Sequence, residues 1–158
     1  MLRDQLQASN PIPVAYRINL LANLFTGAVY RKIAASHGVA RSEFTVVFCL
    51  SNLGELTAQD VVDITGRPKN SVSRAVNALL ERGLVSRRTD PGNARRAPLS
   101  LTRAGKKLYD EVLPVFEARE SALLSVLNSR ERETLERLLM KLAARTDGWE
   151  LSEADELS

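Results

Sequence analysis

The stretch LTAQDVVDITGRPKNSVSRAVNALLERGLV, residues 56–85, decides the fold. Thr57, followed three residues later by Asp60, resembles a capping box and predicts the start of a short helix. Gly66 predicts the end of that helix. Pro68 predicts the start of a second helix, which ends before the next glycine. Two short helices joined in this way have the layout of a helix-turn-helix.

The second of these helices divides into two faces. One face is an apolar stripe at helical spacing, made of Val72, Ala75, Val76, Leu79 and Leu80. The opposite face carries Glu81 at its far end and otherwise short hydrogen-bonding side chains and one arginine: Asn70, Ser73, Arg74 and Asn77. A helix that reads a DNA groove needs side chains that match base-edge donors and acceptors. The face therefore predicts DNA contact, although each residue taken alone is also compatible with an ordinary surface position.

Lys69 and Ser71 extend the candidate DNA contact to the first turn of this helix. Free backbone N–H groups and the helix dipole favour a phosphate at a helix N-terminus. In a helix-turn-helix, the N-terminal part of the second helix enters the major groove. For Ser71 the alternative is an ordinary first-turn residue.

Residues 84–101 predict a β-hairpin, because turn-forming residues at 90–93 separate two short segments. Pro98 restricts its strand to an edge or to an unpaired position. The hairpin carries four arginines, which would repel one another without counter-charge: Arg87, Arg88, Arg95 and Arg96. A wing that reaches a phosphate backbone or a minor groove explains these arginines. The alternative is a solvated loop.

Helices are expected on both sides of this region. Apolar residues at steps of three and four predict a long helix over 12–36. The nearly all-apolar run 42–53 predicts a core helix, with a strand as the alternative. After the hairpin, one helix is expected over 103–127, and the last helix begins after Asn128. The predicted fold class is mainly α with a small β-hairpin wing.

Charge is unevenly distributed along the 158 residues. Residues 67–107 carry eleven Lys and Arg against two Asp and Glu, whereas residues 108–158 carry six against twelve. Such a basic segment is typical of a nucleic-acid binder, and a solvated basic surface is the alternative. The single cysteine, Cys49, forms no internal disulfide. Neither a signal peptide nor an 18-residue apolar run is visible, so we expect a cytoplasmic protein with no membrane partner.

Enzyme chemistry has little support in the sequence. One histidine and one cysteine cannot build a common protein-ligated zinc site. A Gly-rich phosphate loop and a nucleophile elbow are both missing. We therefore predict a protein that is not an enzyme and has no cofactor or metal. A second reading is a winged-helix interaction module that binds an acidic protein partner, and sequence-specific DNA binding would discriminate against it.

Residues 56–66 and 70–85 together resemble the core of the MarR family of transcriptional regulators. The wing from Asp90 to Thr102 has the family's usual length, and the helix order also matches, so the resemblance spans nearly the whole chain. It implies a homodimeric regulator, expected to be a repressor, that binds a near-palindromic double-stranded DNA. It carries DNA-contact roles to Asn70, Ser71, Ser73, Arg74 and Arg95. One departure is Ala94, which stands where the family often has the first of two wing arginines.

The resemblance also implies a division of the chain. Residues 1–36 and 103–146 would form a helical dimerisation region, and residues 37–102 the winged helix-turn-helix. Residues 147–158 are expected to form a flexible tail.

Many members of the family respond to a small aromatic or phenolic effector, which the resemblance makes a candidate partner here. The candidate effector-binding residues are Tyr30, His37, Phe48 and Tyr109. The alternative is that the aromatic residues serve packing and that His37 is simply a helix-end residue. Some relatives sense oxidants through a cysteine, but Cys49 lies in an apolar run, which favours a buried and inert thiol.

Overall fold

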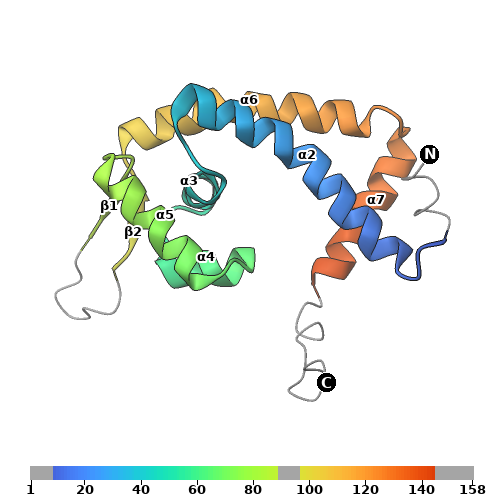
Figure 1. Ribbon diagram of the computed structural model, residues 1–158, viewed down its shortest axis with the longest axis horizontal. Helices are drawn as coiled ribbons and strands as arrows, with labels where there is room; N and C mark the ends of the chain where they lie inside the picture. Colours follow the sequence, from blue (N-terminus) through green and yellow to red (C-terminus); the bar gives the residue numbers. More distant parts are fainter. Residues whose placement is uncertain (1–8, 89–96, 145–158) are drawn as a thin grey trace, which may run out of the picture. The chain divides into compact units, whose positions relative to one another are not determined.

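The computed structural model describes residues 9–88 and 97–144, and it confirms the expected mainly α fold with a hairpin wing (Figure 1). The described elements are α2 (Pro13–His37), α3 (Arg41–Leu53), α4 (Ala58–Thr65), α5 (Lys69–Glu81), β1 (Val85–Arg87), β2 (Leu99–Leu101), α6 (Arg103–Leu124) and α7 (Ser129–Ala143). The chain divides into two compact units, Met1–Arg119 and Glu120–Ser158. None of the described helices is long and apolar enough to cross a bilayer. The expected tail, residues 147–158, lies outside the described residues.

The helix-turn-helix is built from local signals that the structure confirms. The backbone N–H of Asp60 donates to Thr57 Oγ1 over 3.1 Å, and the N–H of Thr57 donates to Asp60 Oδ2 over 2.7 Å. These two bonds satisfy donors at the start of α4 that have no partner within the helix. Gly66 ends α4 with a φ of 62°, a left-handed conformation that glycine adopts without steric cost. Pro68 then precedes α5.

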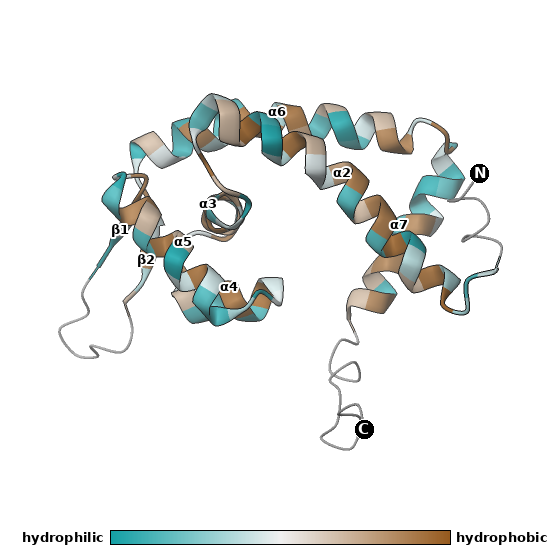
Figure 2. Ribbon diagram, in the orientation of Figure 1, coloured by the Kyte–Doolittle hydropathy of each residue, from teal (hydrophilic) through white to brown (hydrophobic). Residues whose placement is uncertain are grey.

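The core of the first unit is formed by α3, α4, α5 and the wing, together with buried residues of α2 and α6. The run 42–53 is helical, so the strand alternative is wrong, and α3 buries five residues: Phe44, Val46, Val47, Cys49 and Leu50. The apolar stripe expected on α5 is also confirmed, with Val72, Ala75, Val76 and Leu79 buried and Leu80 half-buried. Because this stripe packs against α3 and α4, the polar face of α5 is held outward. Figure 2 shows the two faces as brown and teal segments along α5.

The wing is a short antiparallel pair that is joined to the helical core at its base. β1 and β2 pair with Val85 opposite Leu101 and Arg87 opposite Leu99. Leu56 extends the pairing, because its N–H donates to the Leu99 carbonyl over 3.2 Å and its carbonyl accepts from the Leu99 N–H over 2.8 Å. The segment before α4 therefore holds β2 in place beside the helix-turn-helix.

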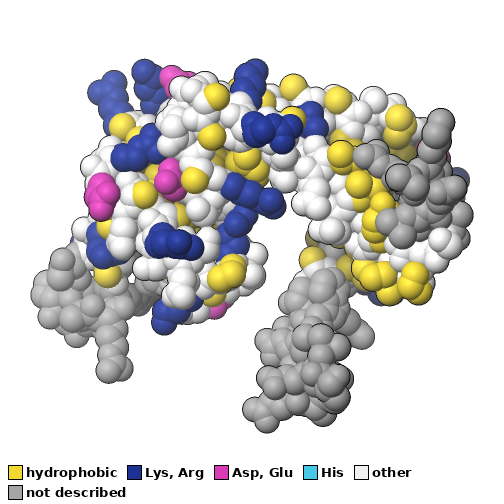
Figure 3. Space-filling view, in the orientation of Figure 1, with side chains coloured by type: hydrophobic (Ala, Val, Ile, Leu, Met, Phe, Trp, Pro, Cys, Tyr) yellow, Lys and Arg dark blue, Asp and Glu magenta, His cyan; other side chains and the backbone are white. Residues whose placement is uncertain are grey.

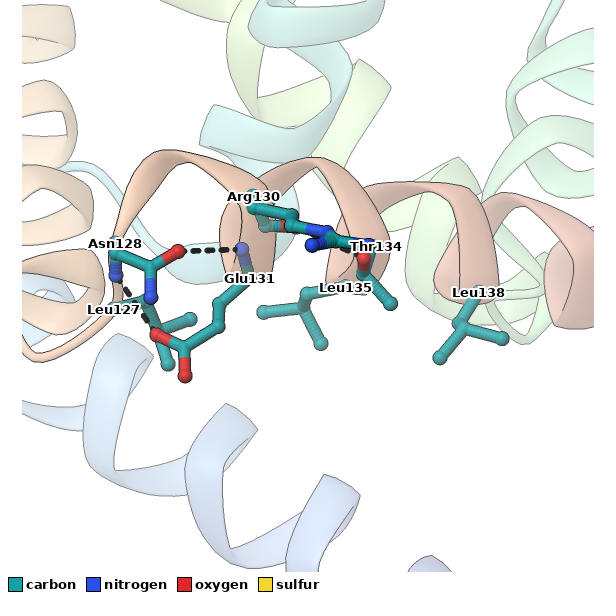
Figure 4. Close-up of a pocket in the computed structure, with 7 residues that line it drawn as sticks. All are labelled: Leu127, Asn128, Arg130, Glu131, Thr134, Leu135 and Leu138. Atoms are coloured by element: carbon teal, nitrogen blue, oxygen red, sulfur yellow. Dashed lines mark hydrogen bonds between the residues drawn. The ribbon is translucent and has the colours of Figure 1, made fainter.

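In the second unit, α7 begins with a complete capping box. The N–H of Glu131 donates to Asn128 Oδ1 over 3.0 Å, and the N–H of Asn128 donates to Glu131 Oε2 over 2.9 Å (Figure 4). Every residue of α7 is exposed in the single chain, including a stripe of leucines: Leu135, Leu138, Leu139 and Leu142. Leu127, Leu135 and Leu138 also line an open groove of about 630 Å³ (Figure 4). An amphipathic helix without a buried face gains little stability from the chain itself.

Candidate nucleic-acid interface

The polar face of α5 lies in solvent. Lys69, Asn70, Ser73, Arg74 and Asn77 are exposed, and Ser71 is half-buried. The structure thus brings the six candidate residues of this helix together on one short helix with a buried opposite face. The side chains are uncharged hydrogen-bonding groups apart from one lysine and one arginine. This set can exchange hydrogen bonds with base edges, which both donate and accept in the major groove.

The start of α5 presents backbone donors as well as side chains. No side chain caps the helix, and the N–H groups of Ser71 and Val72 donate to the Pro68 carbonyl over 2.9 and 3.2 Å. Lys69 and Asn70 precede these groups and are exposed. The first N–H groups of a helix have no intrahelical partner, and the helix dipole is positive there. This end of α5 therefore favours an anionic group such as a phosphate.

The surrounding surface is basic. Figure 3 shows Lys and Arg side chains spread over the part of the molecule that holds α3, α4 and α5, with few Asp and Glu side chains between them. Residues 67–107 supply much of this charge. A surface of this kind attracts a polyanion before any specific contact forms.

The arginines of the wing fall into different settings. Arg87 is exposed on β1. Arg88 is exposed too, but its Nη2 donates to Glu55 Oε2 over 3.0 Å. Glu55 Oε1 accepts from the Ser100 hydroxyl over 3.1 Å, so this carboxylate joins residues that follow β1 and lie in β2. Arg95 and Arg96 lie outside the described residues.

Comparison with known proteins places this architecture in one group. A family model described as "MarR family" matches residues 37–96. The HTH-type transcriptional regulator FarR of Neisseria gonorrhoeae is 28% identical over 118 residues, which cover 75% of this chain and 81% of FarR. A MarR/EmrR family transcriptional regulator from Acinetobacter sp. ADP1 has the same fold, with a TM-score of 0.76, 28% identity, and coverage of 85% of this chain and 94% of that chain. This chain is therefore similar to MarR family regulators, in sequence over residues 37–96 and in fold over most of its length.

A further MarR-type structure is solved with DNA. The S. aureus MepR–DNA complex superposes with a TM-score of 0.71 and covers 86% of this chain and 98% of that chain. At 22% identity, this likeness concerns the fold alone. The winged helix of this chain therefore has the same fold as that of a protein solved in complex with DNA.

Three of the four candidate effector residues, Tyr30, Phe48 and Tyr109, lie in a row of packed aromatic rings. Phe44 stacks between Tyr109 and Phe116, with ring centroids 6.4 and 5.2 Å apart. Tyr30 meets Phe116 edge-on at 5.6 Å, and Phe48 contacts Tyr109 at 6.2 Å. These are packing contacts between rings. One ring also makes a hydrogen bond, because Asn52 Nδ2 donates to the Tyr109 hydroxyl over 3.1 Å. The effector role of these residues stays a prediction.

His37 and Cys49 are not among these aromatic ring contacts, and each has a different environment. His37 ends α2, and its Nδ1 is 3.7 Å from Glu111 Oε2. Cys49 is buried, with 5% of its surface exposed. Burial raises the pKa of the Cys49 thiol above its ordinary value, and the nearby Arg67 guanidinium opposes this effect. A thiol in this setting ionises less readily than a free one, which disfavours reaction with oxidants.

The polar contacts that hold α5 and the wing in place were not predicted from the sequence. Glu55 at the wing and Arg82 after α5 both bond to residues more than 30 positions away in the chain. Local pattern carries no information on such pairs. The residue types themselves are no signal either, because an acidic residue between two helices and an arginine before a glycine are both common.

Proposed function

We propose that this protein is a sequence-specific DNA-binding transcriptional regulator that binds a pseudo-palindromic duplex as a homodimer. The observation that carries the proposal is the exposed face of α5, where Asn70, Ser73, Arg74 and Asn77 lie outward from a buried helix-turn-helix core. The match of residues 37–96 to the MarR family model and the shared fold with the S. aureus MepR–DNA complex support it. In this arrangement the first two turns of α5 enter the major groove.

The division of contacts follows from the side chains. Arg74 donates to guanine through its two-pronged guanidinium, and the asparagine amides pair with adenine edges. Lys69 and the free N–H groups at the start of α5 bind phosphate and set the register of the helix on the duplex. Arg87 and the wing arginines Arg95 and Arg96 contact the backbone or the minor groove beside it.

The exposed apolar surfaces support the dimer. The stripe Leu135, Leu138, Leu139 and Leu142 on α7 has no cover within the described chain, and α2 exposes a second set in its first half: Val14, Ile18, Leu21 and Leu24. Exposed apolar surface of this extent is typical of a protein interface. In a two-fold dimer each α5 addresses one half-site, with centres about 10 base pairs apart.

Two finer assignments complete the proposal. By covering a promoter the dimer represses transcription, and a small aromatic or phenolic effector near Tyr30, His37, Phe48 and Tyr109 releases it. Such a function requires access to chromosomal DNA, so we propose that the protein works in the cytoplasm.

The proposal is tested by selecting duplexes from a random library with the purified protein and measuring their affinity by gel shift. We expect enrichment of an inverted repeat that binds on the order of 10³-fold or more tightly than random duplex at physiological salt. Equal affinity for selected and random duplexes would count against sequence reading. It would favour instead an interaction module for an acidic protein.

A further inference from the structure

Arg82, directly after α5, forms a clamp between three helices. Its Nη2 donates to the carbonyl of His37 over 2.8 Å, and its Nη1 donates to the carbonyl of Gly38 over 2.9 Å and to Glu43 Oε2 over 3.1 Å. These partners lie 39 to 45 residues away in the chain. One guanidinium thus joins the end of the reading helix to the end of α2 and the start of α3.

The partners of Arg82 suit a cation. The last four carbonyl groups of a helix have no N–H donor within the helix, and the negative end of the helix dipole lies there. His37 and Gly38 are at this end of α2, where Gly38 turns the chain with a φ of 61°. Glu43 adds a carboxylate with only 15% of its side chain exposed, and the same oxygen accepts from the Ala40 N–H over 3.1 Å. Such a pair is screened less than one in open solvent.

The geometry of the clamp requires arginine. Three acceptors on two elements are reached by two nitrogen atoms of one planar group. A lysine ammonium is a point charge on a flexible stem, so it does not reproduce this fork. The clamp therefore fixes an orientation as well as a charge.

α2 connects the Arg82 clamp to the proposed dimer contact. α2 runs without interruption from Pro13 to His37, and its first half carries the exposed apolar residues Val14, Ile18, Leu21 and Leu24. The same helix thus bears a proposed dimer contact at one end and the Arg82 clamp at the other. Whatever fixes α5 to the end of α2 also fixes it relative to the dimer contact.

We propose that Arg82 is a positioning residue that sets the half-site spacing the protein accepts. It does so by holding α5 against the C-terminal end of α2, without touching DNA. This inference rests on the proposed function, since it presumes a dimer with two reading helices. It assigns spacing selectivity to a residue outside the base-reading face.

The test compares two duplexes for each variant: the inverted repeat selected by the wild-type protein, and the same repeat with one base pair inserted at its centre. The insertion moves and rotates one half-site by about a tenth of a helical turn. We expect wild type to lose on the order of 100-fold in affinity on the spaced duplex, because simultaneous binding of both half-sites depends on geometry. For Arg82→Lys, which keeps the charge, we expect this ratio to fall below about tenfold, mainly through weaker binding to the original duplex.

Arg31→Lys is the matched control. The Arg31 side chain is exposed on α2 and makes no hydrogen bond or ion pair with the residues that the structure describes, so this variant should keep the wild-type ratio. Glu43→Gln, which weakens one arm of the clamp, should give an intermediate ratio. Circular dichroism and thermal unfolding show whether each variant is folded.

The outcomes separate the two proposals. A folded Arg82→Lys variant with the wild-type ratio overturns the positioning role. So does an Arg82→Lys variant that fails to fold, because Arg82 would then be a general determinant of the fold. A wild-type protein that selects no inverted repeat contradicts the proposed function itself, before any variant is examined.

Discussion

Arg74 and Lys69 are both exposed on α5, yet we expect their removal to have different effects. Arg74 lies between Ser73 and Asn77 on the proposed base-reading face, whereas Lys69 begins the helix. Arg74→Ala should cost about 1–3 kcal/mol of discrimination between the selected duplex and one with a changed base pair. Lys69→Ala should weaken binding to every duplex and reduce the slope of log affinity against log salt by about 1. Affinities measured at several salt concentrations check both, and uniform losses from both variants would contradict this division.

Gly105 is the glycine whose replacement should damage the fold most directly. A Cβ at Gly105 in α6 would lie 2.0 Å from the backbone carbonyl oxygen of Leu84, which cannot move as a side chain would. We expect Gly105→Ala to lower the free energy of unfolding by about 1–3 kcal/mol or more, as overpacking does. The measurement is urea unfolding.

Gly27→Ala is the matched control for that prediction. At Gly27, within α2, the nearest atom to an added Cβ belongs to the Arg31 side chain, at an ordinary 3.6 Å. Alanine is favoured over glycine inside a helix by about 0.5–1 kcal/mol, so Gly27→Ala should be neutral or stabilising. Equal losses from both substitutions would show that space around Gly105 is not the cause.

Cys49 should react slowly and should make stability depend on alkaline pH. Burial raises its pKa in the folded protein, so the folded state keeps the proton at a pH where the unfolded thiol has lost it. The stability contribution is complete below the unfolded pKa and is lost as the pH rises above about 9 towards the folded value. Iodoacetamide should label the native protein more slowly than the urea-unfolded one, and Cys49→Ala should flatten the fall in stability. Equal labelling rates would contradict burial of the thiol.

Whether a residue's contact could be predicted from the sequence depends on how many positions separate the residue from its partner in the chain. The Thr57–Asp60 cap and the glycine after α4 were predicted, because helix ends are decided within a few residues. The bonds of Arg82 and Glu55 were not, because their partners lie more than 30 positions away. The tight approach of Gly105 to Leu84 belongs to the same class, since it depends on how α6 follows the wing.

At the level of elements, periodicity predicted the helices well and left one ambiguity. The run 42–53 is apolar on nearly all sides and rich in β-branched residues, so spacing alone did not exclude a strand. The structure resolves it as α3, whose buried residues pack against α5. The boundary of α6 was placed too late, at residue 127 rather than Leu124, because the apolar residues at 126 and 127 continue the pattern beyond the helix.

α7 supplies a prediction at this scale. Its leucine stripe is exposed in the single chain, and we propose that a second copy covers it. Leu138→Glu places a charge in that stripe and should convert the dimer to a monomer while the helix-turn-helix stays folded. Light scattering at micromolar concentration measures the mass. Arg137→Glu, on the opposite side of α7, is the control and should remain dimeric, and a monomeric wild type would remove the basis of the prediction.

For the whole molecule, the central quantity is the gain from binding two half-sites at once. The reading helix is short, and the contacts of one α5 give only part of the affinity of a regulator. Linking two such helices makes the second binding event intramolecular, which raises the apparent affinity on the order of 10²–10⁴-fold when the geometry permits both contacts. The unpartnered faces of α2 and α7 therefore matter for DNA binding although they lie far from α5 in sequence.

A duplex of the same length, in which one half-site is replaced by unrelated sequence, tests this coupling. Wild type should bind the complete inverted repeat on the order of 10²–10⁴-fold more tightly than the half-site duplex of equal length, measured by fluorescence anisotropy at fixed salt. Leu138→Glu should bind both duplexes with nearly the same affinity, close to that of wild type on the half-site, because its α5 is unchanged. If wild type bound both duplexes equally, one reading helix would suffice and the dimer would serve another purpose. If Leu138→Glu lost even half-site binding, α7 would support the fold of the reading domain rather than its pairing.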